Sequence, residues 1–228
     1  MKALIATVIF LVSLQAPTYD LIWKPKAGMK VAYTLRAEGK LLEEDLLVTS
    51  DVDLHVKQVE ANGDYTMGTT FKNGTFKFGA ESEKMPDGPE EVEKFNRRGE
   101  ELDKDKKKQA GEDDPDMFSE ILGRAAEIQP PTKPVAVGET WTHEFPEDKA
   151  MKLPKAIGTY KILEVKDSKV VVSLQYAEQS VEDPTTATGK LILSDVDFLP
   201  LSLESDVKNV RFHDGVPPGN VRLTMKVK

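Results

Sequence analysis

The chain has 228 residues, a formal net charge of −8 and no cysteine. Without a thiol it cannot form a disulfide scaffold, a thiolate zinc or iron–sulfur site, or a cysteine nucleophile. The acidic balance and the lack of a concentrated basic stripe argue against nucleic-acid binding, because neutralising phosphates requires clustered Lys and Arg. The length suits one large domain or two small ones.

The first residues have the pattern of an export signal. Met1-Lys2 gives a positive start, an apolar run follows over residues 3–14, and Ala16 is a small residue suited to cleavage. The run is shorter than the about 20 residues that a membrane-spanning helix needs. A buried N-terminal strand or an uncleaved anchor are the alternatives. We therefore expect residues 1–16 to be a signal peptide, and the mature chain to be periplasmic or secreted with no stable membrane span.

Residues 19–79 alternate between polar and apolar side chains, as half-buried antiparallel strands do. The alternation assigns three sets of side chains to shared strand faces: Val31, Tyr33 and Leu35; Val48, Val52, Leu54 and Val56; and Tyr65, Met67, Thr69 and Phe71. Asn62-Gly63-Asp64 is a tight-turn signal, because Asn and Gly tolerate positive φ. The sequence therefore predicts that a strand near 46–60 pairs with a strand near 64–72.

The middle of the chain is strongly charged and predicts helix. Residues 81–116 contain 14 acidic and 8 basic residues, a net charge of −6. Pro89-Glu90-Glu91 resembles a helix start, although a solvated loop or a partner-binding arm would also fit. Asp114-Pro115 opens a second helix, whose apolar residues from Met117 to Ile128 fall on one face.

The remaining sequence predicts further strands, over residues 137–145, 156–165, 169–181, 186–197, 200–211 and 220–227. We therefore predict a mainly β protein of ten or eleven strands. Its antiparallel sheet is curved, as a half-barrel or as two packed sheets, with one or two helices inserted midway. The expected domain, 17–228, has two similar halves (19–79 and 133–228) joined by a charged helical insert (80–132).

Two short motifs resemble known exported proteins. The stretch from Pro131 to Trp141, PTKPVAVGETW, resembles a P-x-K-P-V-x-V-G-D/E-x-W pattern of secreted bacterial β-rich proteins of unknown function. The predicted hairpin from Gly189 to Leu203 is similar to one in periplasmic lipoprotein carriers, which wrap a curved sheet around apolar cargo. The resemblance implies a curved sheet and an apolar ligand, and it implies no catalytic residue. The chain has no cysteine to carry a lipid anchor.

One row of polar side chains could hold a metal ion. Asp51, Asp53 and His55 are spaced i, i+2, i+4, so they share one strand face and offer oxygen and nitrogen ligands to a divalent cation. A solvated outer face, opposite Val52 and Leu54, is the alternative. Motifs for nucleotides, zinc proteases and serine hydrolases are missing, so no cofactor is expected.

The large side chains could line a ligand cavity. Those available include Trp23, Trp141, Phe71, Phe76, Phe78, Tyr160 and Tyr176. They either form an ordinary filled core or line an apolar pocket between the sheet and the helix, and the candidates for such a pocket are Trp141, Phe145, Phe118 and Ile121.

The function expected from these features is non-enzymatic. The protein would bind or carry an apolar or lipidic ligand, or bind an envelope protein. The alternatives are a structural or interaction module with a filled core, and a hydrolase that uses paired carboxylates or a metal at Asp51, Asp53 and His55.

Overall fold

The computed structural model describes residues 16–102, 117–211 and 217–228. The predicted signal peptide, apart from Ala16, and the predicted helix cap at Asp114-Pro115 lie outside these residues. The strands are β1 (Thr18–Tyr19), β2 (Lys30–Leu41), β3 (Glu44–Val59), β4 (Tyr65–Phe78), β5 (Glu81–Lys84), β6 (Glu91–Phe95), β7 (Val135–Ala136), β8 (Thr140–Phe145), β9 (Ala156–Lys166), β10 (Lys169–Glu178), β11 (Thr186–Ser194), β12 (Pro200–Val210) and β13 (Gly219–Val227). The helix is α2 (Met117–Ala126).

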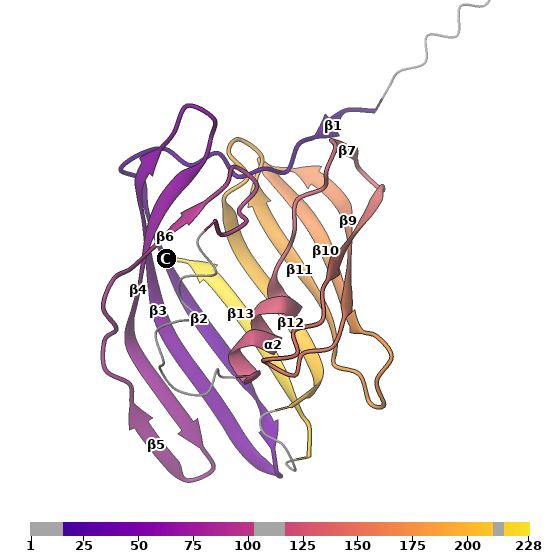
Figure 1. Cartoon of the computed structure of the whole chain (residues 1–228). Coiled ribbons are helices and arrows are strands. Elements are labelled where there is room, and N and C mark those ends of the chain that lie inside the picture. The colour runs from indigo at the N-terminus through magenta and orange to yellow at the C-terminus, as the bar shows by residue number, and fades with distance from the viewer. Residues whose placement is uncertain (1–15, 103–116, 212–216) are drawn as a thin grey trace, which may run out of the picture.

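Eleven of the strands form one open antiparallel sheet, and this confirms the predicted fold class. The order is β5-β4-β3-β2-β13-β12-β11-β10-β9-β8, and β6 pairs with the same strand, β4, as β5 does. The C-terminal strand β13 pairs with β2, so strands from both ends of the chain meet inside one sheet. The predicted pairing of β3 with β4 is also present. Figure 1 shows the strands side by side in one curved sheet.

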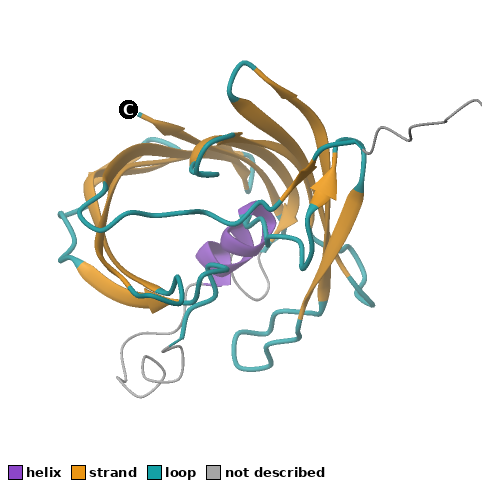
Figure 2. Ribbon diagram, turned by 90° about the horizontal axis from the view of Figure 1, so that it is seen from above, coloured by secondary structure: helices purple, strands orange, loops and turns teal. Residues whose placement is uncertain are grey.

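Helix α2 lies within the curve of the sheet (Figure 2). Its buried side chains are Ile121, Leu122 and Ala125, which follow the apolar stripe predicted from the sequence. The Ser205 hydroxyl on β12 donates a hydrogen bond to the Ala125 carbonyl, at 3.4 Å. We call the sheet face that carries Ser205 the inner face, and the opposite one the outer face.

Two glycines, which have no side chain, allow neighbouring strands of the sheet to approach closely. A Cβ atom at Gly39 on β2 would lie 3.0 Å from the Val221 Cα of β13, and it would collide with the Asn220 carbonyl oxygen. A Cβ at Gly189 on β11 would lie 3.0 Å from the Ser205 Cα of β12. Neighbouring strands therefore approach on the inner face at these two points, as glycine kinks permit in curved sheets.

The prediction of a helix that begins at Pro89 is wrong. The residues that follow form strand β6, which pairs antiparallel with the first part of β4. The Phe95 ring stacks on the Tyr65 ring, with 5.4 Å between the ring centroids. The pairing satisfies the backbone groups at the edge of β4, whereas an isolated helix with a thin apolar stripe gains little from packing.

The N-terminal segment crosses one end of the sheet. Strand β1 pairs with β7, and the chain then runs across that end to β2 (Figure 1). The Lys24 amide donates to the Asp197 carbonyl at 2.9 Å, and the Trp23 ring meets the Tyr65 ring edge-on at 5.3 Å. Among the described residues, no helix is long and apolar enough to cross a membrane.

Candidate functional site

The inner face becomes progressively more exposed with distance from α2. A row of directly paired residues crosses five strands, from Ser205 on β12 through Leu223, Ala37 and Val48 to Phe76 on β4. Directly paired residues have side chains on the same face of a sheet. Ser205 is 2 % exposed, because α2 covers it, whereas Phe76 is 40 % exposed.

Strands β2, β3 and β4 therefore carry an apolar surface that α2 does not bury. We call it the β2–β4 apolar face, and it consists of Leu35, Val48, Val52, Leu54, Met67, Phe71, Phe76 and Phe78. Phe71 is 44 % exposed, and the members other than Phe71 and Phe76 are partly buried. The sets of side chains that the alternation assigned to shared faces do share the inner face, as the register shows.

The inner-face positions of these three strands carry one charged side chain, Glu44, which pairs with Leu41 at the start of β3. The basic residues of the strands, such as Arg36, Lys57 and Lys72, alternate with the apolar ones and so lie on the outer face. The polar inner-face side chains of these strands include Ser50 and Thr69. Ser50 is buried, and its hydroxyl donates to the Lys72 carbonyl at 3.2 Å.

The four residues predicted to line a cavity belong to the packed core near α2. Ile121 and Phe145 are buried in the core, and Phe118 and Trp141 are partly buried against it. The Phe145 ring packs against the Tyr176 ring at 5.7 Å. The structure thus brings the four residues together around one core, and the exposed apolar surface lies elsewhere, on β2–β4.

A pocket of about 280 Å³, lined by both polar and apolar side chains, lies beside β8. Its lining includes Arg98, Glu100, Lys133, Trp141 and His143. Burial lowers the pKa of His143, while the Glu100 and Glu144 carboxylates act in the opposite direction. Two hydrogen bonds hold the wall of the pocket in place. Arg98 Nη2 donates to the Pro130 and Pro131 carbonyls at 2.7 and 2.8 Å.

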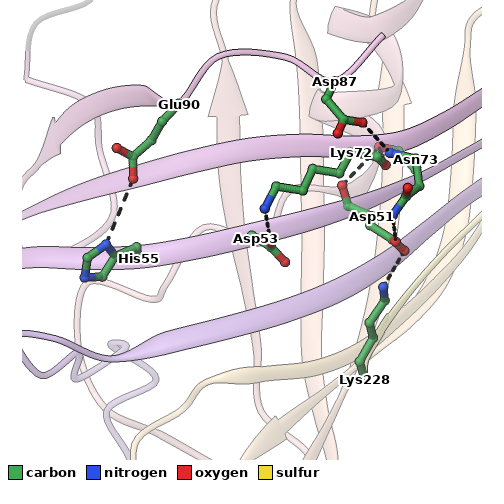
Figure 3. A network of polar contacts seen from close by, with 9 residues as sticks. Asp51, Asp53, His55, Lys72, Asn73, Asp87, Glu90 and Lys228 are labelled. Atoms are coloured by element: carbon green, nitrogen blue, oxygen red, sulfur yellow. Dashed lines mark hydrogen bonds and ion pairs between the residues drawn. The ribbon is translucent and has the colours of Figure 1, made fainter. Parts of the chain in front are cut away.

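The residues predicted to bind a metal lie on the outer face, where each meets a different partner (Figure 3). Lys228 Nζ lies 2.6 Å from an Asp51 carboxylate oxygen, Lys72 Nζ lies 2.8 Å from Asp53, and His55 Nδ1 lies 4.0 Å from Glu90. Among the described residues, no three His, Asp or Glu side chains are arranged to hold a metal ion. Asp51 and Asp53 therefore form ion pairs with separate lysines, and His55 lies beside a different carboxylate, so the three side chains share no common ligand.

The ion pairs on the outer face shift the pKa values of their members. The hydrogen bond from Lys228, followed by that from Asn73, lowers the pKa of Asp51. The Asp53 carboxylate raises the pKa of Lys72, and the hydrogen bond from Lys57 lowers the pKa of Glu90. Each shift favours the charged form of Asp51, Lys72 or Glu90.

An aromatic cluster closes the inner face at the end where the N-terminal segment crosses. Tyr65 lies between Trp23 and Phe95, and its burial raises its pKa to about 12. The Tyr33 hydroxyl, also buried, donates to the Pro200 carbonyl at 2.9 Å. These tyrosines are neutral at physiological pH, so they add no charge to the apolar surface.

The sequence contained a partial signal for the β2–β4 apolar face. Phe71, Phe76 and Phe78 are among the large side chains that, from the sequence, could line a ligand cavity. Alternation places Phe71 on the face shared with Met67, whereas a period of two would put the other two phenylalanines on the opposite face. A register shift between Thr49 and Asp51 brings all three onto the inner face. Alternation also does not indicate that α2 packs on strands β10–β12 and leaves these residues uncovered.

Comparisons with known proteins bear on the fold. No family model matches the chain, and no curated protein matches it by sequence. A solved structure described as "Lipid-protein interactions in lipovitellin" is similar over 89 % of this chain, with a TM-score of 0.50 and 11 % sequence identity. The matched part is 25 % of the lipovitellin chain, so this chain spans about a quarter of that protein's length. At this identity the likeness is one of fold.

Proposed function

We propose that the protein is a non-enzymatic binder of apolar or lipidic ligands, and that the ligand lies on the β2–β4 apolar face. The observation that carries this proposal is the exposure of Phe71 and Phe76, at 44 % and 40 %, on a face that is otherwise buried or partly buried. Removing apolar surface from water stabilises a complex by about 25 cal/mol per Å². Contiguous exposed apolar surfaces on soluble proteins often mark binding sites.

Two further features support the proposal. The curved, open sheet is similar to part of lipovitellin, a protein whose structure is described in terms of lipid–protein interactions. The analogy rests on fold, which by itself does not determine function. The side chains of the face are nearly all carbon, so they suit burial of an acyl chain or another apolar group rather than proton transfer or nucleophilic attack.

A neutral fluorescent apolar probe, such as N-phenyl-1-naphthylamine, tests the proposal on the purified chain. We expect saturable binding, and about tenfold weaker binding for Phe71→Ser or Phe76→Ser, because each removes part of the apolar contact area. Val92→Ser is the matched control, since Val92 on β6 is 56 % exposed and pairs with Gly68 on the outer face. The control should bind like the parent. Equal losses in all three variants, or no saturable binding, would contradict the proposal.

We also propose that the protein acts outside the cytoplasm. The proposal is supported by the positive start at Lys2 and the apolar run over residues 3–14. Expression of the full chain in a bacterial host, followed by fractionation and intact-mass measurement, tests it. We expect an extracytoplasmic product that lacks about 16 residues, which is the usual size of a short signal peptide. A full-length product confined to the cytoplasm would contradict the proposal.

A further inference from the structure

We infer that the ligand of the β2–β4 apolar face is an amphiphile whose polar end is cationic. The inference rests on the proposed function, and it adds the chemical class of the ligand. The observation behind it is a row of four carboxylates on β5 and β6, along the rim of the apolar face.

Strand pairing places all four carboxylates on the inner side. On β5, Glu83 pairs directly with Phe76, and Glu81 pairs with Phe78. On β6, Glu91 pairs with Thr69, and Glu93 pairs with Met67. Since directly paired residues share a face, the acidic side chains continue the inner face beyond β4. The row that begins beneath α2 at Ser205 and passes through Val48 and Phe76 therefore ends on a carboxylate, Glu83.

The basic residues of the same two strands lie on the other side. Lys84 on β5 pairs with Thr75, and Lys94 on β6 pairs with Thr66, both of which are outer-face positions. Lys94 Nζ also lies 2.6 Å from the Glu60 carboxylate. Over the described ranges, no ion pair engages Glu81, Glu83 or Glu91, and all three are exposed. Their charge is therefore available to a ligand.

The charge pattern and the apolar surface specify one amphiphile. At a strand spacing of about 4.8 Å, the distance from Ala37 to Glu83 across β3 and β4 is about 14 Å. An acyl chain laid along this row would contact apolar side chains only, and its polar end would reach the carboxylates. A cationic group would be attracted there, whereas an anionic head group would be repelled by several like charges. Val48, Val52 and Leu54 are only partly exposed, which favours a thin, flexible chain over a helix.

The experiment compares three amphiphiles with the same twelve-carbon chain on the purified full chain. Dodecyltrimethylammonium, dodecyl maltoside and dodecanoate each displace the bound neutral fluorophore at neutral pH, below their micelle concentrations. We expect the cationic amphiphile to act at a concentration about tenfold lower than dodecanoate, which corresponds to about 1.4 kcal/mol. The neutral maltoside should lie between them. The difference should shrink at high salt, because exposed charges are screened.

Variants of the rim identify the source of the preference. The double variant Glu83→Gln/Glu91→Gln removes two exposed charges and keeps the side-chain shape, so it should lose most of the cationic preference and bind the maltoside unchanged. Glu164→Gln, at an exposed position of β9, is the matched control and should keep the preference. Equal or reversed preference in the parent chain would overturn the inference, as would full preference in the double variant. Failure of the fluorophore itself to bind would overturn the proposed function instead.

Discussion

Gly39 illustrates how a single residue position controls the shape of the inner face. A Cβ atom there would meet backbone atoms of β13 rather than the end of a movable side chain. Backbone within a paired sheet moves only if neighbouring hydrogen bonds are strained. The close approach of β2 and β13, and with it the local curvature of the sheet, depends on the absence of a side chain at this position.

Replacing Gly39 by Ala should therefore destabilise the protein. We expect a loss of about 1–3 kcal/mol in the free energy of unfolding, measured by urea denaturation, because an extra methyl group in a packed region forces the backbone to shift. Gly123→Ala is the matched control. Apart from the chain neighbours and the backbone of the helix itself, no atom lies within 4 Å of a Cβ at Gly123, which is exposed on α2. This change should therefore be neutral or stabilise by up to about 1 kcal/mol. Similar effects of the two changes would contradict this explanation.

The polar row on β3 shows what residue spacing can and cannot predict. The i, i+2, i+4 spacing of Asp51, Asp53 and His55 correctly places them on one face opposite Val52 and Leu54. Their partners come from β4, from the segment before β6 and from the C-terminus, at Lys72, Glu90 and Lys228. Spacing within one strand contains no information about residues so far away in the chain, so it does not predict the ion pairs.

At the level of elements, α2 contributes to the core rather than to a ligand cavity. Ile121 is fully buried, and Ala125 beside Ser205 is also inaccessible to solvent. The helix packs on β10, β11 and β12. Side chains from the helix and the sheet fill this contact. Burial of the α2 side chains is therefore expected to stabilise the fold.

Ile121→Ala should destabilise the fold without weakening ligand binding. We expect a loss of about 2–5 kcal/mol in the free energy of unfolding, because the change leaves a cavity under the helix. Glu120→Ala, at an exposed position one residue earlier, should stay within about 0.5 kcal/mol of the parent. The folded fraction of Ile121→Ala should bind the fluorophore with the parent's affinity. Weaker binding would show that the predicted pocket near Ile121 takes the ligand after all.

Strand β6 explains why the charged insert is harder to predict than the rest of the chain. Its composition, rich in Glu and Lys, favours helix or solvated loop over strand. The pairing of β6 with an edge of β4 and the stacking of Phe95 on Tyr65 outweigh this local preference. Elements with a strong apolar alternation, such as β3, β4 and β9–β13, are predicted correctly because burial and local preference agree there.

At the scale of the whole molecule, side chains connect the two ends of the open sheet. Arg98 follows β6 at one end, and its guanidinium binds the carbonyls of Pro130 and Pro131. The Trp141 indole on β8, at the other end, donates to the neighbouring Gln129 carbonyl at 2.8 Å. The segment from Gln129 to Pro131 thus bridges strands that do not pair with each other.

Arg98→Ala should loosen this bridge. We expect a loss of about 1.5–3 kcal/mol in the free energy of unfolding, because two hydrogen bonds from a charged group are removed. Hydrogen exchange should rise in residues 94–101 and 129–133. Arg97→Ala is the control, since Arg97 is adjacent in sequence but exposed. Equal exchange in the two variants would contradict a bridging role for Arg98.

The sequence by itself determined which side chains share a face within each uninterrupted stretch of strand, because the period of two in β strands is a local property. It also predicted the curved antiparallel sheet, the apolar stripe of α2 and the aromatic residues that a ligand could meet. It did not reveal the register shift in β4 that places Phe71 and Phe76 on one face. Only the tertiary structure decided which part of the inner face α2 covers, and which part remains exposed at Phe71 and Phe76. It likewise decided that the carboxylates of β5 and β6 border that surface. Both outcomes depend on pairing and packing between residues far apart in the chain, and local patterns do not contain that information.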